Sequence, residues 1–382
     1  MNYDLNICLL SADEQQRRIE RLRLDSPALI CDNANLFYLT GRVFCGYLFL
    51  QPGEAPQYFV KRPSELKGNN ITLIRKPEDI GLTCPALGLE FGSLAYAQAM
   101  RLQAAFGATE LIDISGNIMR SRSVKTLLEQ QLLREDGIRH AGVYARIPGL
   151  FREGMTDIEL QAEIERIDRL HGCLGQFRVN GTDMEIHMGN VITGLNADTP
   201  SPYDFAMGGA GLSPSLPVGA SGEEIKPGQA VMVDMNGNFN GYMTDMTRTY
   251  ACGSLPEKAV KAHQCSIDIC HELARRGKPG ADCKQLYETA LNIAREAGFA
   301  DCFMGHKYHA GFVGHGVGIQ INELPVLAPR SKMVLTEGNV IAIEPKFVIE
   351  GVGAVGIENT YICTADGLEC ITNAPEELIQ LL

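Results

Sequence analysis

Hydrophobic positions along the first 120 residues change between helical and strand periods. Charged residues predominate over 14–24 and alanines over 94–105, and both segments predict helices. Short apolar runs predict strands at 28–31, 46–50, 58–60 and 110–114. The Pro52-Gly53 pair is a turn signal ahead of the third of these strands. Helices that alternate with short strands in this way predict a small α/β domain over residues 1–120.

The rest of the chain, residues 121–382, begins with helices and ends with strands. Helices are predicted at 124–146, from Thr156 to just before Gly172, at 257–276 and at 282–297. Thr156 and Glu159 form the capping box that opens the second of these helices. Gly, Pro and Ser are frequent over 181–228, which predicts loops with short strands, and 312–371 is rich in strand signals. We therefore expect a second, larger domain over 121–382.

Composition narrows the class of protein. The chain has 382 residues, of which 45% are hydrophobic and 21% are charged, as expected for a soluble globular protein of two or three domains. Its 34 basic and 46 acidic residues give a formal net charge of −12. An acidic balance of this kind argues against non-specific binding to nucleic acid or to an anionic membrane. Most of the acids are expected to lie in water.

Two further absences from the sequence bear on its location. No stretch of about 18 apolar residues is present, so no membrane-spanning helix is expected, and residues 1–10 lack a basic region and a cleavage site typical of a secretory signal. The 12 cysteines contain no Cys-x-x-Cys pair. The sequence therefore predicts a cytoplasmic protein with reduced thiols, many of them buried.

Two acids interrupt apolar stretches where hydrophobic residues are expected. Asp234 ends the run 230–234, and Asp245 lies within 242–250, with hairpin-turn signals between the two runs. If the turn centres between Phe239 and Asn240, the two carboxylates lie directly opposite each other on one face. Opposed like charges are destabilising unless a cation lies between them.

Two more acids and one histidine complete this pattern. Glu344 ends the apolar strand 340–344, Glu358 lies inside the strand-like stretch 355–362, and His315 stands between two glycines. Each residue alone is compatible with an exposed edge strand or an ordinary histidine. Four acids in apolar strands argue against that interpretation, because buried carboxylates must be paired or bound to metal. Four carboxylates and one imidazole suit a dinuclear site for Mn, Co, Fe or Zn.

With these motifs the sequence resembles the pita-bread metallohydrolases, which include Xaa-Pro aminopeptidases, prolidases, methionine aminopeptidases and the metal-free creatinases. Residues 35–41 (NLFYLTG) look like the creatinase-type N-terminal domain, and 120–125 look like the start of the catalytic domain. The Asp, Asp, His, Glu, Glu series is specific to this family. The resemblance implies an α/β (α+β) protein with a small creatinase-type domain and a pita-bread domain, whose curved antiparallel sheet is flanked by helices. It also implies a homodimer.

The resemblance further implies a role for each member of the series. Asp234 would chelate one of two divalent ions, Asp245 and Glu358 would bridge both, and His315 and Glu344 would complete the other. A water bridging the ions would be the nucleophile and Glu344 its proton acceptor. Two cations lower the pKa of a shared water and polarise the scissile carbonyl.

Two threonines follow ligands at strand spacing. Thr247 and Thr360 each lie two residues beyond a ligand, on the same strand face if the strands are regular. They are candidates to hydrogen-bond to the ligands, with ordinary strand threonines as the alternative.

The sequence departs from the peptidases of this family at two substrate-side histidines. Val218 stands in the region of the first and cannot donate a side-chain hydrogen bond, and Asn322 stands at the second, where it can donate one but cannot carry a proton. His309 is a candidate catalytic substitute, together with His306, and both are also compatible with loop histidines that have no role. Tyr203 is a candidate substrate-side residue.

The segment around this tyrosine departs from the peptidase pattern as well. Residues 196–211 form a segment longer than that pattern, which contains Asp204 and has His187 nearby, and it could shape a different pocket.

Three classes of function follow. The first is an exopeptidase that cleaves a peptide bond next to proline. The second is another enzyme on the same fold that acts on a small polar metabolite: an amidinohydrolase, an ectoine-type hydrolase or a lyase. The third, a non-enzymatic binding module, is disfavoured because all five metal ligands are present.

The glycine pattern at 351–356 resembles a dinucleotide-binding loop, but a strand-like segment follows it instead of the helix that such a loop requires.

Overall fold

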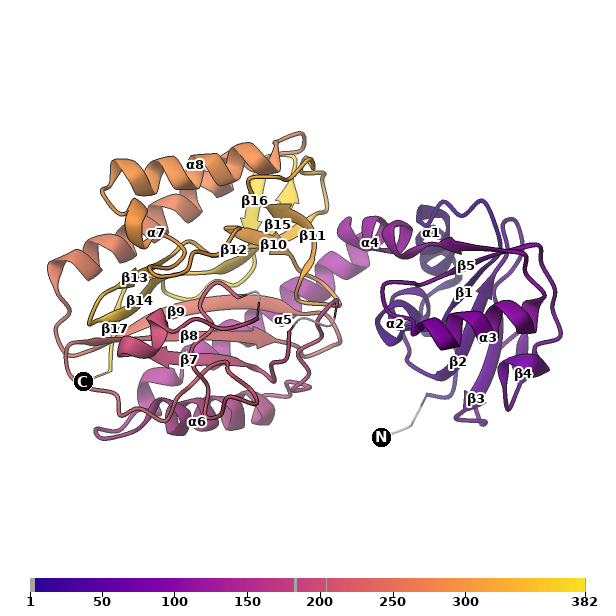
Figure 1. The fold of residues 1–382 in the computed structure, drawn as a ribbon, viewed down its shortest axis with the longest axis horizontal. Coiled ribbons are helices and arrows are strands. Elements are labelled where there is room, and N and C mark those ends of the chain that lie inside the picture. Colours follow the sequence, from indigo (N-terminus) through magenta and orange to yellow (C-terminus); the bar gives the residue numbers. More distant parts are fainter. Residues whose placement is uncertain (1–3, 182–183, 204, 382) are drawn as a thin grey trace. The chain divides into compact units, whose positions relative to one another are not determined.

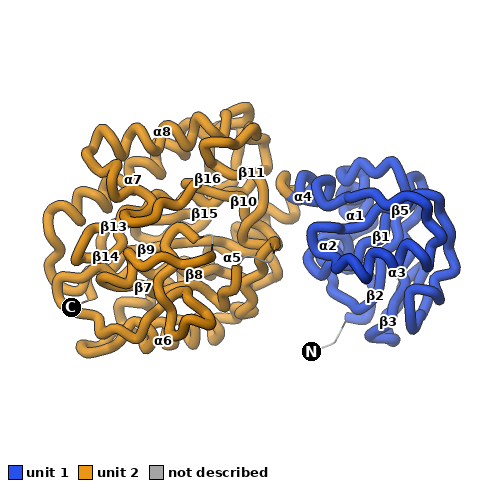
Figure 2. The backbone as a smooth tube through the Cα atoms, in the orientation of Figure 1, with its two compact units in different colours: residues 1–122 blue, residues 123–382 orange. Residues whose placement is uncertain are grey.

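The computed structural model describes residues 4–181, 184–203 and 205–381. The chain forms two compact units, residues 1–122 and 123–382 (Figure 2). None of the helices that the structure describes combines the length and hydrophobicity that a bilayer crossing requires. The 12 cysteines are all free thiols.

The first unit is built on a six-stranded sheet in the order β4-β3-β2-β1-β5-β6. Its strands are β1 (Ala28–Ile30), β2 (Cys45–Leu50), β3 (Gln57–Arg62), β4 (Ile71–Leu73), β5 (Ala86–Leu89) and β6 (Glu110–Asp113). Its helices are α1 (Ala12–Arg21), α2 (Asn33–Thr40), α3 (Tyr96–Phe106) and α4 (Ser115–Ser123), with a short 3-10 turn at η1 (Pro77–Asp79). Leu102 and Phe106 of α3 pack with Leu29, Phe49 and Leu87 of the sheet in one buried cluster. This unit is the small α/β domain that the sequence pattern predicts, with α2 and α4 as additional helices.

The second unit contains three sheets. A four-stranded sheet has the order β17-β9-β8-β7, a five-stranded sheet has the order β11-β10-β12-β15-β16, and β13 pairs with β14. The strands of the first sheet are β7 (Gly189–Thr193), β8 (Gln229–Gly237), β9 (Thr244–Cys252) and β17 (Ile379–Gln380). The remaining strands are β10 (Gly314–Gly316), β11 (Glu323–Leu327), β12 (Val340–Ile343), β13 (Lys346–Ile349), β14 (Gly353–Gly356), β15 (Asn359–Thr364) and β16 (Gly367–Cys370). Apart from the parallel β17–β9 pair, the described pairings in this unit are antiparallel.

Helices cover these sheets on two sides. In Figure 1, α5 (Leu127–Tyr144) and α6 (Asp157–Leu170) lie on one side of the strands, and α7 (Glu257–Arg276) and α8 (Cys283–Glu296) lie on the other. Short 3-10 turns are present at η2 (Ile147–Gly149), η3 (Gly194–Asp198) and η4 (Ala300–Cys302). The bounds of α7 are those that the sequence predicts. The predicted capping box also forms, since Glu159 N donates to Thr156 Oγ1 over 3.3 Å and Thr156 N donates to a Glu159 carboxylate oxygen over 2.8 Å.

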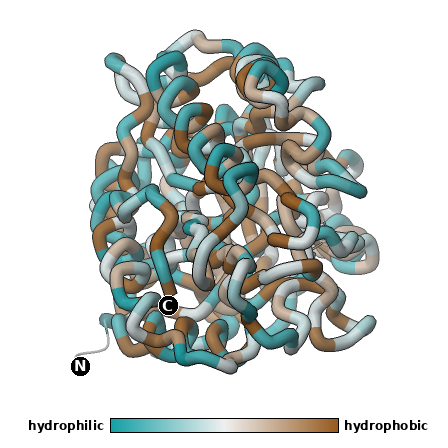
Figure 3. Tube along the Cα trace, turned by 90° about the vertical axis from the view of Figure 1, so that its left-hand side faces the viewer, coloured by the Kyte–Doolittle hydropathy of each residue, from teal (hydrophilic) through white to brown (hydrophobic). Residues whose placement is uncertain are grey.

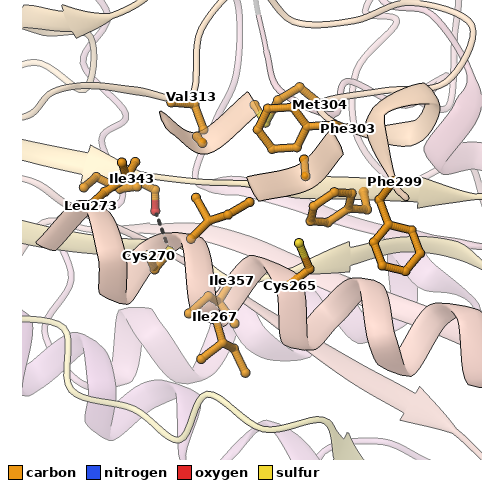
Figure 4. Packing of buried hydrophobic residues seen from close by; sticks show 14 of the residues in the cluster. Cys265, Ile267, Cys270, Leu273, Phe299, Phe303, Met304, Val313, Ile343 and Ile357 are labelled. Atoms are coloured by element: carbon orange, nitrogen blue, oxygen red, sulfur yellow. Dashed lines mark hydrogen bonds between the residues drawn. The ribbon is translucent and has the colours of Figure 1, made fainter. Parts of the chain in front are cut away.

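The two helix layers have separate hydrophobic cores. One core joins α5 and α6 to one face of β7, β8 and β9, and the other joins α7 and α8 to β11, β12, β13, β14 and β15. Figure 4 shows Cys265 and Cys270 of α7 in the second core, with Cys270 Sγ 3.7 Å from the Ile343 carbonyl oxygen. Hydropathy changes over short distances along the trace (Figure 3), as expected where each element buries one face. The strands that carry the acids therefore lie between two packed layers.

The glycine pattern at 351–356 has no helix after it. Gly353–Gly356 forms β14 and the chain continues into β15. The strand that the sequence predicts after these glycines is therefore present.

Candidate metal centre

The hairpin of β8 and β9 carries the two aspartates on one face of the sheet. Asp234 is paired with Thr247, and Asp245 with Asn236. The prediction that the two acids lie directly opposite each other is wrong, because the connecting loop covers 238–243 and is centred one residue later than expected. The Asp136 carboxylate, more than a hundred residues away in the sequence, accepts the Phe239 N–H over 3.0 Å and fixes that loop. The two carboxylates are diagonal neighbours, still within reach of a shared cation.

Glu344 and Glu358 lie where one strand pairing gives way to another. Ile343 pairs with Asn359, whereas Lys346 pairs with Gly356, so both acids stand in the break between the two pairings. Glu344 follows its strand as predicted. The prediction that Glu358 lies inside a strand is wrong: the stretch 355–362 is interrupted there, and the Glu358 backbone instead forms an isolated bridge with Thr247.

Gly356 explains the interruption. It has φ 143°, and a Cβ on this residue would lie 2.6 Å from the Pro345 carbonyl oxygen. A side chain is therefore excluded at this position, and the chain can turn Glu358 toward β9.

His315 is brought to the acids by β10. A Cβ at Gly314 would lie 2.5 Å from the Ala342 carbonyl oxygen, and one at Gly316 would lie 2.2 Å from that of Leu324, so only glycine fits on either side. His315 Nδ1 lies 3.2 Å from the Gly316 carbonyl oxygen. This contact favours a proton on Nδ1 and leaves Nε2 facing the carboxylates.

Three carboxylates surround this nitrogen. His315 Nε2 lies 3.3 Å from Glu344 Oε1, 3.7 Å from Asp245 Oδ2 and 3.9 Å from Glu358 Oε1. Burial lowers the pKa of His315, but the contact with Glu344 and the charges of the acids outweigh it and raise the pKa to about 10. Burial and the charge of Asp234 raise the pKa of Asp245 to about 8. The five residues predicted as ligands thus form one carboxylate–histidine cluster.

The cluster divides into two groups of possible ligand atoms. We call Asp245, His315 and Glu358 the ion group; their ligand atoms lie within 4.8 Å of one another. Its oxygen and imidazole donors suit a divalent transition metal. Glu358 Oε1 is buried and has no hydrogen-bond partner among the described residues. A buried carboxylate oxygen without a partner is costly, so a cation fits this group.

The second group is Asp234, Glu344 and Glu358, which we call the lysine group. Lys346 Nζ lies 2.8 Å from Asp234 Oδ2, 2.7 Å from Glu344 Oε2 and 3.1 Å from Glu358 Oε2. The Lys346 side chain is 0% exposed. Burial lowers the pKa of this lysine, but the three carboxylates raise it well above its usual range. The ammonium is therefore charged and paired.

Lys346 is the member of this cluster that the sequence did not predict. The signal was present: a lysine opens the apolar strand 346–349, two residues after Glu344. The rule that selected the acids, a charge inside an apolar strand, applies to it equally.

Comparison with known proteins identifies the family. The model of metallopeptidase family M24 matches residues 131–365, and the model of the creatinase/prolidase N-terminal domain matches residues 14–124. The chain belongs to metallopeptidase family M24. It is a metal-dependent hydrolase, as the sequence predicts.

Relatives of this M24 chain are matched over almost their whole length. A protein of Pyrococcus furiosus named Xaa-Pro dipeptidase is 27% identical over 375 residues, which cover 95% of this chain and 96% of the relative. The prolidase structure from Pyrococcus horikoshii OT3 has a TM-score of 0.79 at 24% identity and covers 96% of this chain and 100% of the other. The Xaa-Pro dipeptidase structure from Bacillus anthracis has a TM-score of 0.79 at 25% identity, with 96% and 99% covered. The predicted pita-bread fold is confirmed, and these relatives do not favour the metabolite enzymes considered as the alternative.

Two residues of the M24 chain hold Glu358 in position. Thr247 Oγ1 donates to Glu358 Oε2 over 2.8 Å. The buried guanidinium of Arg248 donates from Nη1 to the carbonyl oxygens of Thr247 and Glu358, both over 2.8 Å. Thr360 acts differently: its hydroxyl exchanges two 2.8 Å hydrogen bonds with the backbone of Asp245 and does not contact the carboxylate. One of the two predicted threonines therefore contacts the side chain of a predicted ligand, and the other orders the backbone of a predicted ligand.

His309 and His306, the candidates to replace the two absent family histidines, make their described hydrogen bonds and ion pairs with other residues than the carboxylate–histidine cluster. His309 Nδ1 lies 2.8 Å from the Phe303 carbonyl oxygen, and His306 Nδ1 lies 3.1 Å from Asp198. Both line a pocket of about 180 Å³ between residues 197–208 and 305–311, and none of the five predicted ligands is among its lining residues in the part of the chain that is described. The structure gives His309 no contact with the carboxylates among its described hydrogen bonds and ion pairs.

The substrate-side candidates are engaged elsewhere. Asn322 uses its amide on the backbone of Asn180, accepting the N–H over 2.6 Å and donating to the carbonyl oxygen over 2.9 Å. Tyr203 donates its hydroxyl to Glu185 over 3.0 Å and lines the same pocket as His309. Asp204 lies outside the described residues. Asn322 therefore fixes a neighbouring loop in this structure, and its amide is not turned toward the cluster.

Proposed function

We propose that this M24 chain is an exopeptidase that hydrolyses short peptides at the bond next to a proline, using a divalent metal ion held by the carboxylate–histidine cluster. The observation that carries the proposal is the ion group, in which His315 Nε2 lies 3.9 Å from Glu358 Oε1, an oxygen with no hydrogen-bond partner among the described residues. The relatives named Xaa-Pro dipeptidase support the choice of substrate.

The residues of the ion group would hold the metal. Asp245, His315 and Glu358 offer two carboxylate oxygens and one imidazole nitrogen; the two acids are buried, and the His315 side chain is 14% exposed. A bound divalent ion supplies a nucleophilic water at neutral pH and polarises the scissile carbonyl. Thr247 keeps one oxygen of Glu358 engaged, so that the other oxygen stays directed at the ion group.

Glu344 is the proposed proton acceptor. Its Oε2 is engaged by Lys346, whereas Oε1 faces the ion group, 3.3 Å from His315 Nε2. Burial raises the pKa of Glu344, but the charge of Lys346 and the contact with His315 outweigh it and lower the pKa to about 2. The carboxylate is therefore ionised. Because a pKa this low makes it a weak base, we propose that Oε1 orients the nucleophilic water and relays its proton to the leaving amine.

A peptide panel tests the proposal. The full-length protein is stripped of metal, reloaded with Mn²⁺, Co²⁺ or Zn²⁺, and assayed against Ala-Pro, Leu-Pro and Ala-Pro-Gly, with Ala-Ala as the substrate without proline. We expect metal-dependent turnover of the proline peptides and much slower turnover of Ala-Ala. Metal-loaded protein that cleaves none of the proline peptides would contradict the proposal and direct the search to small polar metabolites.

A pair of histidine variants provides the control. His315→Ala removes a member of the ion group and should abolish turnover. His271→Ala removes an exposed imidazole of α7 that pairs with Glu376, and should leave turnover unchanged. Equal activity in both variants would show that hydrolysis occurs at another site.

A further inference from the structure

Lys346 lies at the point where a second metal ion would have to bind. The three residues that form the lysine group are the same three that its ammonium contacts, at 2.7–3.1 Å. We propose that Lys346 Nζ takes the place of one of the two cations, so that this chain binds a single divalent ion, in the ion group. The proposal rests on the proposed function only in taking the cluster to bind a divalent metal.

The hydrogen-bond count of the ammonium supports this assignment. A lysine ammonium has three N–H donors and no acceptor. Here it meets three carboxylates, one oxygen from each, and its side chain is fully buried. Every donor therefore has an anionic acceptor, and no donor remains for water or substrate.

The backbone fixes Lys346 beside these acids. Lys346 opens β13 and pairs with Gly356 at the start of the break that holds Glu344 and Glu358. Its carbonyl oxygen accepts the Met304 N–H over 2.7 Å. The next residue, Phe347, is buried in the α7–α8 core and contacts Phe303, with ring centroids 5.3 Å apart. The lysine is thus anchored on both sides.

An ion in the lysine group and the ammonium exclude each other. A divalent transition metal binds carboxylate oxygens at about 2.0–2.2 Å. A metal held by the same three oxygens that surround Nζ at 2.7–3.1 Å would occupy the volume of the ammonium itself. Two positive charges at such a separation also repel strongly in a buried site.

The ion group, by contrast, stays open. Glu358 divides its oxygens: Oε2 contacts Lys346 and Thr247, whereas Oε1 has no hydrogen-bond partner among the described residues. Glu344 is divided in the same way, with Oε2 on Lys346 and Oε1 toward His315. Each glutamate therefore links the ammonium to the ion group, as a bridging ligand would link two metals.

The charges agree with one ion and one ammonium. The cluster holds four carboxylates, and a lysine with one divalent ion neutralises three of these four charges. Two divalent ions beside the same lysine would give the buried cluster an excess of positive charge, which a buried site disfavours. In this proposal, one divalent ion and the Lys346 ammonium take the place of the two divalent ions that the sequence predicts.

Metal stoichiometry tests the proposal without measuring activity. The purified full-length protein is saturated with Mn²⁺, freed of excess ion, and analysed by elemental mass spectrometry and by the electron paramagnetic resonance spectrum of the bound Mn²⁺. We expect one ion per chain and the spectrum of an isolated ion. Two ions per chain with an exchange-coupled spectrum would overturn this inference and leave the metal-dependent hydrolase standing. No bound ion would contradict the proposed function itself, and this inference with it.

Variants separate the two groups. Lys346→Ala removes the ammonium and should raise the stoichiometry to two ions per chain, whereas Lys284→Ala, at an exposed position on α8, should leave it at one. If circular dichroism shows that Lys346→Ala does not fold, Asp234→Asn and His315→Ala decide the question. Asp234→Asn should keep the ion and His315→Ala should lose it. Loss of the ion from Asp234→Asn would overturn the proposal, because the ion would then need the lysine group.

Discussion

Thr247→Val tests how the protein aims a carboxylate at its metal. Valine has nearly the shape of threonine, so the fully buried position keeps its packing and loses only the hydroxyl. The hydroxyl donates to Glu358 Oε2 over 2.8 Å. A hydrogen bond to a charged group contributes about 1.5–3 kcal/mol to stability. Because Lys346 still contacts that oxygen at 3.1 Å, we expect the low end of this range.

The same substitution should weaken metal binding. Without the hydroxyl, Lys346 alone holds Glu358 Oε2, so Oε1 is directed less firmly at the ion group. Loss of such a support lowers metal affinity by about 10- to 100-fold. The free energy of unfolding should fall by about 1.5 kcal/mol, which corresponds to a fall in Tm of about 3–6 °C for a unit of this size. Isothermal titration with Mn²⁺ measures the affinity, and calorimetry of the metal-free protein measures the stability.

Thr249→Val is the matched control. Thr249 lies on the same face of β9, two residues on, and its hydroxyl donates to the Gly356 carbonyl oxygen over 2.7 Å and accepts the Gly356 N–H over 3.1 Å. This variant should lose a similar amount of stability and keep the metal affinity of the unmodified protein. Equal metal affinity in Thr247→Val and Thr249→Val would refute the view that Thr247 orients Glu358.

Three other predictions follow from the same contacts. Arg248→Met removes the buried guanidinium that ties the Thr247 and Glu358 carbonyl oxygens together. Because a buried acceptor left unpaired costs about 1–3 kcal/mol, the free energy of unfolding measured in urea should fall by about 3 kcal/mol, and a loss below about 1 kcal/mol would contradict this role. Burial, opposed by the Phe239 N–H, raises the pKa of Asp136 to about 7. The contribution of the protonated Asp136 carboxyl group to the free energy of unfolding is therefore full below about pH 4 and is lost as the pH rises through 7. The Tm of Asp136→Asn relative to the unmodified protein should therefore rise from pH 5 to pH 8, and a constant difference would argue against the shift. Chelation of the metal should lower Tm reversibly, because an ion present at a hundred times its Kd adds about 2.7 kcal/mol to the free energy of unfolding. A Tm that does not respond to chelator or to added Mn²⁺ would exclude an ion whose binding stabilises the fold.

The sequence predicted the members of the cluster because burial of charge has a local signature. Asp234, Asp245, Glu344 and Glu358 each stand in or beside an apolar strand, and His315 stands between glycines that no other residue can replace. These signals need no knowledge of the partner strands. The long helices were predictable for a similar reason, since their caps and apolar spacing lie within the segment itself.

What the sequence did not predict depends on contacts between distant segments. The register of the β8–β9 hairpin is set by its six-residue loop, in which the Phe239 N–H donates to the Asp136 carboxylate of helix α5. The break at Glu358 depends on Gly356 packing against Pro345.

Lys346 illustrates the same limit. Its place in an apolar strand was a local signal, but the sequence does not show that its ammonium pairs with Asp234, 112 residues away. Helix α4 (Ser115–Ser123) escaped because its sequence, SGNIMRSRS, is mostly polar and lacks helical apolar spacing.

Anomalous scattering from crystals loaded with Mn²⁺ or Zn²⁺ tests the central claim most directly, because it locates each bound ion. The account predicts one anomalous peak per chain, within coordination distance of Asp245, His315 and Glu358, with the Lys346 ammonium retained among Asp234, Glu344 and Glu358. A second peak in the lysine group with Lys346 displaced would contradict the single-ion centre. The absence of any peak at the carboxylate–histidine cluster would contradict the metal-dependent mechanism as a whole.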